Sequence, residues 1–302
     1  MSHEALLESL NRVAISPYNE VVAYEYLYSL KSSSLKKITA HTVLQKKLPT
    51  EALRDECGLF EAEGYGEVET FIDEKMGHFS VAINNTPSWP TKLADSQRPS
   101  PLFYYRGDIA LIGSPSVSIV GARKASELGI KRAAKIAKEM VEAGYSVVSG
   151  LAKGIDTAAM RAAFSFNGNV IGVIGTPLDE CYPKENKELQ MTVQSRGLLV
   201  SQVPFFKYSR QPFSTKKLYF PERNELMAAI SDATIIIEAS DTSGTLTQAN
   251  ACLHQKRPLF ILRSCVQNEQ VTWPKRYVEQ PGVYVIDTPR QVIDRLSGVG
   301  HG

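Results

Sequence analysis

The sequence predicts a doubly wound α/β fold, with a mostly parallel sheet and a smaller helical domain before it. Two patterns support this prediction. From residue 116 onward, short apolar runs rich in β-branched residues alternate with helical patterns, which is typical of a parallel sheet flanked by helices. Residues 4–76 mix helical stretches with polar breaks and contain almost no β-branched runs. We therefore expect a helical domain at 1–78, a doubly wound α/β domain at 79–290 and a C-terminal tail at 291–302.

Composition indicates a soluble globular protein, since 43% of the 302 residues are hydrophobic and 22% are charged. No apolar run approaches the roughly 18 residues needed to span a bilayer, and the N-terminus does not resemble a signal peptide. We expect a cytoplasmic protein with no membrane partner. The four cysteines are far apart and no histidine completes a metal set, so we expect reduced thiols, no metal and no cofactor. The net charge of only +2 means that a nucleic-acid site must come from local clusters of basic residues.

The expected strands are short and are bounded by glycine, proline or polar residues. They cover residues 117–120, 145–149, 169–175, 197–201, 233–239, 258–262 and 283–286. Residues 128–144 place apolar side chains on one helical stripe and end in a glycine, which predicts a helix. The four prolines between residues 84 and 101 predict an extended connector on the surface. Ligands of such sheets bind outside the carboxyl ends of the strands, so the turns there are candidate binding elements.

Three of these turns combine glycines with basic or hydroxylated residues, and read GARKAS, GLAKGID and SDTSGTLT. Backbone N–H groups at helix N-termini bind anions, arginine can hold a phosphate with two hydrogen bonds, and lysine adds a point charge. The three turns together predict a phosphate-binding rim. Its residues are Gly121, Arg123, Lys124, Ser126, Gly150, Lys153, Gly154, Ser243, Gly244 and Thr245.

A simpler interpretation of the same turns stays open. Glycines are needed in any tight strand-to-helix turn, so they do not by themselves indicate a ligand. Within the turns, we expect Ser126 to cap the helix that follows it, and Asp156 to cap or orient its helix instead of acting as a base.

The segment at 203–224, VPFFKYSRQPFSTKKLYFPERN, interleaves six aromatic residues with five bases and has Glu222 as its only acid. Nucleobases stack on aromatic faces while cations follow the phosphates, so this composition is typical of a groove for single-stranded nucleic acid. Alternatively, the aromatics anchor a long connection to the sheet while the bases stay in solvent.

The chain resembles the DNA-processing protein A (Smf) family in a series of motifs with the same order and spacing. The stretch PLFYYRGD at 101–108 resembles the start of that family's Rossmann-like core, and the resemblance extends over about residues 80–263. The motifs are GARxxSxxG at 121–129, SGLAKGID at 149–156, NVIGVIG at 169–175 followed by LDECYPKEN at 178–186, FPERNELMAAIS at 220–231 and EASDTSGTLTQA at 238–249.

The resemblance implies an extended Rossmann fold that binds single-stranded DNA, protects it and delivers it to a RecA-type recombinase in natural transformation or recombination. It also implies a homodimer. The residues that correspond to the family's DNA contacts are Arg123, Lys216 or Lys217, Phe220, and Arg223 with Asn224. We expect a non-enzymatic protein on this basis.

The chain also departs from the family pattern. The family usually reads Arg-Asn-Arg where this chain has Arg223-Asn224-Glu225, so an acid replaces one cation. Only about forty residues follow the matching region, so we expect a divergent member without a C-terminal winged-helix domain.

Two other functions stay open. The same superfamily includes phosphoribohydrolases with a motif that resembles PGGxGTxxE, but here Thr247 and Gln248 lie near the position of its glutamate. Glu238 could substitute for that glutamate, although the interpretation we favour is a carboxylate satisfied by neighbouring backbone N–H groups. The second is a nucleotide-binding sensor without catalysis, for example in phage defence. A dehydrogenase is disfavoured because GxGxxG is absent from the first turn.

Overall fold

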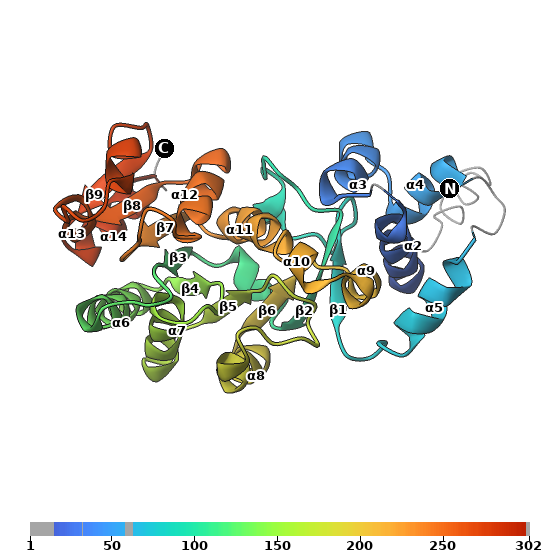
Figure 1. Cartoon of the computed structure of the whole chain (residues 1–302), viewed down its shortest axis with the longest axis horizontal. Helices are drawn as coiled ribbons and strands as arrows, with labels where there is room; N and C mark the ends of the chain where they lie inside the picture. The colour runs from blue at the N-terminus through green and yellow to red at the C-terminus, as the bar shows by residue number, and fades with distance from the viewer. Residues whose placement is uncertain (1–14, 32, 58–62, 300–302) are drawn as a thin grey trace, which may run out of the picture.

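The computed structural model describes residues 15–31, 33–57 and 63–299, which form one nine-stranded sheet covered by helices (Figure 1). The strand order is β1-β2-β6-β5-β4-β3-β7-β8-β9. β1 pairs antiparallel with β2, and β2 with β6, whereas all other neighbours are parallel. The strands are β1 (Ser80–Ile83), β2 (Leu102–Gly107), β3 (Ser116–Val120), β4 (Ser146–Ser149), β5 (Val170–Val173), β6 (Leu198–Ser201), β7 (Ala233–Ile236), β8 (Leu259–Leu262) and β9 (Val283–Ile286).

Helices cover both faces of the parallel part of the sheet, which confirms the predicted α/β class. Figure 1 shows α6, α7 and α8 on one face and α11 and α12 on the other. No helix in the described ranges is both long and apolar enough to cross a bilayer. The α-helices are α2 (Pro17–Ser29), α3 (Leu35–His41), α4 (Pro49–Cys57), α5 (Tyr65–Asp73), α6 (Glu127–Glu142), α7 (Ile155–Ser165), α8 (Lys187–Arg196), α9 (Phe205–Arg210), α10 (Phe213–Lys216), α11 (Tyr219–Ile230), α12 (Thr245–His254), α13 (Arg263–Val266) and α14 (Pro289–Val299).

The strand order reverses between β3 and β7. From β3 the chain runs outward through β4, β5 and β6, and it then returns to the other side of β3 with β7. The strands from β3 to β8 are buried along their whole length, because helices cover both of their faces. Such a reversal opens a crevice at the carboxyl ends of the two central strands, and this crevice is where doubly wound proteins bind ligands.

Two segments differ from the sequence-based expectation. Residues 291–299 of the expected C-terminal tail belong to helix α14. This helix is part of the folded domain, because Val292 is buried and Ile293 and Leu296 pack against the hydrophobic core. The connector at 84–101 contains a 3₁₀ turn at Thr91–Leu93 and is fixed to the sheet domain by an ion pair between Lys92 and Asp232. The expected division of the chain at residues 78 and 290 stays a prediction.

The N-terminal helices share one hydrophobic core with the sheet domain, and Glu25 lies where they meet. Its carboxylate accepts hydrogen bonds from the Tyr104 hydroxyl of β2 (2.6 Å) and from the backbone N–H groups of Phe205 (2.8 Å) and Phe206 (3.0 Å) at the start of α9. Burial raises the pKa of Glu25 to about 7, although these three donors oppose the shift. A single carboxyl group therefore links α2, the sheet and the basic-aromatic segment.

The free energy of unfolding is expected to fall as the pH rises from about 5 to 8. The folded-state pKa of Glu25 lies above its unfolded value of 4.5, so its contribution is present at low pH and is lost as the pH rises through about 7. The difference between the two pKa values corresponds to about 3 kcal/mol.

Urea unfolding at a series of pH values checks this pH dependence. Glu25→Gln should flatten the dependence, leaving a residual slope from Glu222, whose pKa is also raised to about 7 by burial. The same slope in Glu25→Gln as in the unaltered protein would contradict the assignment, and the exposed Glu74→Gln serves as control.

Candidate nucleic-acid interface

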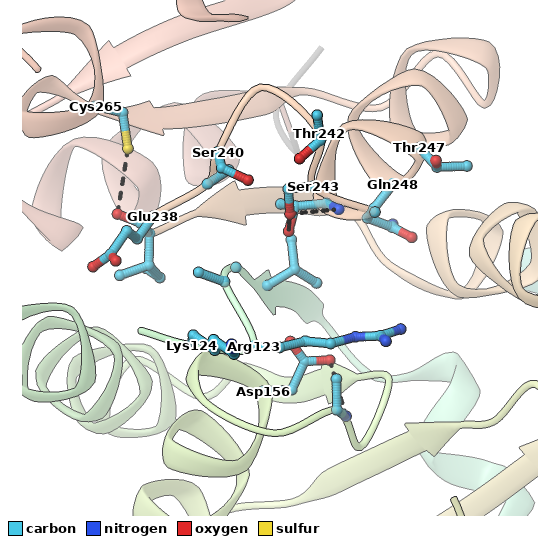
Figure 2. Close-up of a pocket in the computed structure, with 18 of the residues that line it drawn as sticks. Arg123, Lys124, Asp156, Glu238, Ser240, Thr242, Ser243, Thr247, Gln248 and Cys265 are labelled. Carbon is cyan, nitrogen blue, oxygen red and sulfur yellow. Dashed lines mark hydrogen bonds between the residues drawn. The ribbon is translucent and has the colours of Figure 1, made fainter. Parts of the chain in front are cut away.

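A pocket of about 990 Å³ opens where the strand order reverses. Figure 2 shows Arg123, Lys124 and Asp156 on one side of it, and the turn that carries Ser240 and Ser243 on the other. Gly150 and Lys153 line a smaller hollow beside it, whereas Gly154, Lys216 and Lys217 line neither. The predicted site residues that line the pocket are Gly121, Arg123, Lys124, Ser126, Phe220, Arg223, Asn224, Ser243, Gly244 and Thr245.

The turn after β3 presents two exposed cations to this pocket. The Ala122 N–H donates to the Glu238 carbonyl (2.7 Å), which ties the turn to the end of β7. Gly121 is required at this close approach, because a Cβ atom there would lie 2.8 Å from the same carbonyl oxygen. Among the described residues, Arg123 has no hydrogen bond or ion pair with a protein group, and its side chain extends along the pocket in Figure 2. The Arg123 guanidinium is therefore available to a ligand.

The N-terminus of α6 already holds an anion from the protein itself. The Glu238 carboxylate accepts from the Ser126 backbone N–H (3.1 Å) and from the Ser126 hydroxyl (2.7 Å). Ser126 also caps α6 as expected, because its hydroxyl oxygen accepts from the Gly129 N–H (2.9 Å). Glu238 is thus satisfied in the way favoured from the sequence. A phosphate at this helix end would meet a carboxylate, so the Ser126 N–H is not an open anion site.

The turn after β4 is likewise satisfied from within. The buried Asp156 carboxylate accepts from the N–H groups of Gly150 (3.1 Å) and Ala152 (3.4 Å), and burial raises its pKa while Arg223 opposes the shift. Gly154 has φ +76°, and a Cβ atom there would lie 2.3 Å from the Ala122 carbonyl oxygen, so only glycine fits. Asp156 lies in the first turn of α7 and orients the turn before this helix, whereas the sequence predicted that it would cap or orient the helix itself.

Lys153 lines the smaller hollow and not the large pocket. Its ammonium group pairs with the Glu185 carboxylate at 2.6 Å, and both side chains are exposed. The second turn therefore contributes one cation at the outer rim, and that cation already has a partner within the protein.

The third turn is the most open of the three. The Ser243 hydroxyl donates to the Thr245 hydroxyl (2.8 Å), and its oxygen accepts from the Thr245 N–H (3.2 Å), which shapes the first turn of α12. Asp241 fixes the preceding loop by accepting from the N–H groups of Thr272 (2.9 Å) and Trp273 (2.6 Å). A cluster of small hydroxylated side chains therefore faces Arg123 across the pocket.

Arg223 is buried, with only 7% of its surface exposed. Its Nη1 donates to the carbonyl oxygens of Gly150 and Val173, both at 2.8 Å, and its Nε donates to the Asn224 side chain at 2.9 Å. Burial lowers its pKa to about 10, although Asp156 opposes this shift. Gly150 must be a glycine because a Cβ atom there would lie 2.1 Å from Arg223 Nη1. Arg223 therefore joins α11 to the ends of β4 and β5, with only a small part of it facing the pocket.

The basic-aromatic segment forms α9, α10 and the first turn of α11. The bases of α9 are engaged by the N-terminal region, since Lys207 donates to the Ser33 carbonyl and Arg210 pairs with Glu67. The alternative interpretation of this segment, as an anchored connection, holds for the four aromatics Phe205, Phe206, Tyr208 and Tyr219, which are buried.

Four other residues of the segment, at 213–220, lie closer to solvent. Phe220 lines both hollows, and Phe213 is 68% exposed on α10. Lys217 is exposed, whereas the Lys216 ammonium lies 4.0 Å above the centre of the Tyr208 ring. The bases and aromatics available to a ligand are therefore confined to the second half of the segment.

The lining residues that were not predicted from the sequence include one base and one aromatic residue. Arg132 lines the large pocket from α6, three residues after Gly129 and so on the same face of the helix. Tyr182 lines the smaller hollow from the loop after β5. Glu225, which replaces a family cation, lies outside both hollows and instead contacts His254 and Arg98.

A doubly wound sheet with a basic, hydroxyl-lined pocket at its strand-order reversal defines an extended Rossmann-like protein. Comparison with known families is consistent with this class. Residues 80–297 match the model of DNA recombination-mediator protein A, and the chain belongs to that family of DNA-processing proteins.

Individual relatives agree with this membership. DNA processing protein DprA of Streptococcus pneumoniae is 34% identical over 202 residues, which cover 65% of this chain and 69% of the relative. DprA of Bacillus subtilis is 25% identical over 266 residues, which cover 88% of this chain and 86% of the relative.

Solved structures of the same family show the same architecture. The crystal structure of S. pneumoniae DprA superposes with a TM-score of 0.73 and 26% identity, and covers 93% of this chain and 98% of its own. DNA processing protein A of Helicobacter pylori, whose structure gives insights into its single-stranded DNA binding mode, has a TM-score of 0.61 and 26% identity over 73% of this chain and 96% of its own.

Proposed function

We propose that this protein binds single-stranded DNA along the pocket at the strand-order reversal and does no chemistry on it. The observation that carries the proposal is the exposed Arg123 guanidinium, which has no protein partner among the described residues and faces the hydroxyl-lined turn before α12. An arginine held in this way can bind a phosphate with two hydrogen bonds. Family membership and the single-stranded DNA binding of the H. pylori relative support a DNA strand as the ligand.

The arrangement of carboxylates in the pocket supports a binding role over hydrolysis. Its acidic lining residues are Asp156, which accepts from the N–H groups of Gly150 and Ala152, and Glu238, which accepts from the N–H and hydroxyl groups of Ser126. Near the position of the phosphoribohydrolase glutamate, Thr247 is exposed and Gln248 is buried. A general acid or base must be within reach of the substrate proton that it transfers, and these two carboxylates are committed to structural hydrogen bonds.

Family membership also supports the partners and the cellular role. We propose that the protein protects single-stranded DNA and transfers it to a RecA-type recombinase during transformation or recombination in the cytoplasm. It would do so as a homodimer. A bound DNA strand must be able to enter and leave the pocket, and the pocket is open to solvent.

Fluorescence anisotropy of a labelled oligothymidine over a salt series tests the proposal. The double variant Lys216→Ala with Lys217→Ala is expected to weaken binding roughly three- to tenfold at low salt. It should also make the log–log salt slope less steep by about 0.7 for each phosphate that the variant no longer neutralises. Lys216 ends α10 and Lys217 follows it, two residues before α11, whose first turn lines the pocket.

The matched control is the double variant Lys135→Ala with Lys138→Ala, which removes the same charge from the outer face of α6. An unchanged slope in the Lys216 and Lys217 variant would contradict their assignment. Binding of a nucleoside monophosphate without binding of the oligonucleotide would replace the proposal with a nucleotide sensor or a hydrolase.

A further inference from the structure

Glu238 places a carboxylate at one end of a pocket that is rich in cations and hydroxyl groups. It lines this pocket together with Arg123, Lys124 and Arg132. In Figure 2 it lies near Cys265 on the left of the view, whereas the Arg123 side chain extends to the right. Within the described part of the chain, no cation forms an ion pair with the Glu238 carboxylate. The pocket therefore has a negative charge at the end away from the Arg123 guanidinium.

The Glu238 carboxylate occupies the N-terminus of α6. It accepts hydrogen bonds from the Ser126 backbone N–H (3.1 Å) and from the Ser126 hydroxyl (2.7 Å). In doubly wound proteins the end of a helix at this place commonly binds a phosphate, because its free N–H groups and its dipole favour an anion. In this protein the anion at that position is a side chain of the protein itself.

Gly129 makes room for this carboxylate. A Cβ atom at residue 129 would lie 2.2 Å from Glu238 Oε2, although the helical backbone of Gly129 is one that any residue adopts. Alanine would otherwise favour the helix more than glycine does. The Glu238 backbone is fixed as well, since its carbonyl accepts from the Ala122 N–H at the other end of the same turn (2.7 Å). The carboxylate is therefore built into the end of α6.

Arg132 lies near the same carboxylate, on the face of α6 that carries Gly129. Burial raises the pKa of the Cys265 thiol to about 12, and the charge of Glu238 adds to this shift while that of Arg132 opposes it. Both charges therefore act at the same part of the pocket wall. A phosphate that approached this end would be attracted by Arg132 and repelled by Glu238.

The strength of the repulsion depends on the charge of the phosphate. A phosphodiester within a strand carries one negative charge, whereas a terminal phosphate carries about 1.5 to 2 at pH 7. The Coulomb energy is proportional to the product of the two charges, so Glu238 disfavours a terminal phosphate more strongly than a phosphodiester.

We propose that Glu238 is a specificity-determining residue, which closes the end of α6 to phosphate so that the pocket accepts the phosphodiesters of a strand and rejects free nucleotides. The inference rests on the proposed function for its ligand, the DNA strand. It adds the class of ligand that the pocket excludes and the residue that excludes it.

Calorimetric titration of the full chain with thymidine 5′-monophosphate and with the methyl ester of its phosphate tests this selectivity. Glu238→Gln is expected to tighten binding of the monophosphate about tenfold and that of the methyl ester at most about threefold, because glutamine keeps the shape but not the charge. Glu142→Gln removes a carboxylate from the other end of α6 and is the matched control. Equal changes for both ligands, or no change for either, would overturn the proposal.

Gly129→Ala tests the position of the carboxylate without removing it. The added Cβ should displace Glu238 from the helix end and lower the melting temperature by at least about 2 °C. In a Glu238→Ala background the same substitution should raise the melting temperature by about 1–2 °C, because alanine favours the helix. An equal decrease in both backgrounds would contradict the assigned position and overturn the proposal. If the unaltered protein does not bind oligothymidine, the proposed function fails, whereas the mononucleotide titrations still decide the role of Glu238.

Discussion

Arg123→Ala is expected to weaken oligothymidine binding by at least about tenfold and to leave the melting temperature unchanged. A hydrogen-bonded contact to a charged group contributes about 1.5–3 kcal/mol, and an arginine can make two such bonds to one phosphate. The same side chain is exposed and has no hydrogen bond or ion pair with a described residue, so the fold loses nothing when it is removed. It also lowers the pKa of the buried Arg223 by like-charge repulsion, which the substitution relieves.

The measurement is anisotropy at fixed salt, paired with a thermal melt of each variant. Arg123→Lys should give an intermediate affinity, because a lysine keeps the charge but not the two-point geometry. Arg290→Ala removes an exposed arginine from α14, where it pairs with Asp294, and serves as the control. Equal affinities for Arg123→Ala and for this control would remove Arg123 from the site.

The parallel sheet could be predicted because the signal for each strand is local. The segments that became β3 to β9 are short apolar runs that end at a glycine or a polar turn, and burial on both faces demands this pattern. β1 and β2 are different because they pair antiparallel at the edge of the sheet. β1 has four residues with only two of them buried, which is too short for a recognisable period.

The residues that form the site could also be predicted, but not which of its N–H groups are already hydrogen-bonded to another part of the protein. The turns at Arg123 and Ser243 do meet at one pocket, because parallel strands end at the same edge of the sheet. Which N–H groups remain open depends on contacts across the fold. Glu238 is 112 residues away from Ser126 in the sequence, and nothing in the turn after β3 indicates that this carboxylate will occupy the end of α6.

The basic-aromatic segment shows a similar limit. Its composition fits both a DNA groove and an anchored connection, and in the structure the two halves of the segment have different roles. Phe205 and Phe206 are buried and pack on Phe79 and Phe71, which precede the Rossmann-like motifs and belong to a region whose packing could not be predicted from the sequence. Phe220 is left at the pocket. Residue type alone does not distinguish these roles, because the same ring can pack in a core or stack on a base.

Arg223→Ala is expected to lower the free energy of unfolding by about 3–5 kcal/mol, the cost of leaving a buried charge without its partner. The guanidinium donates to the Gly150 and Val173 carbonyls and to the Asn224 side chain, and its charge offsets the desolvation of Asp156. Its removal therefore takes a donor from three buried acceptors and the counter-charge from Asp156. Urea unfolding at neutral pH measures the decrease.

Two comparisons separate this structural role of Arg223 from direct contact with DNA. In an Asp156→Asn background, the same Arg223→Ala substitution should cost less, because the buried carboxylate is gone and only the three hydrogen bonds of Arg223 are lost. The alternative result is that Arg223→Ala has the same free energy of unfolding as the unaltered protein but no longer binds oligothymidine. In that case Arg223 contacts the DNA strand directly, as the resemblance to the family implies. The buried position at 7% exposure favours the first result, in which the arginine shapes the turn beside which the DNA lies.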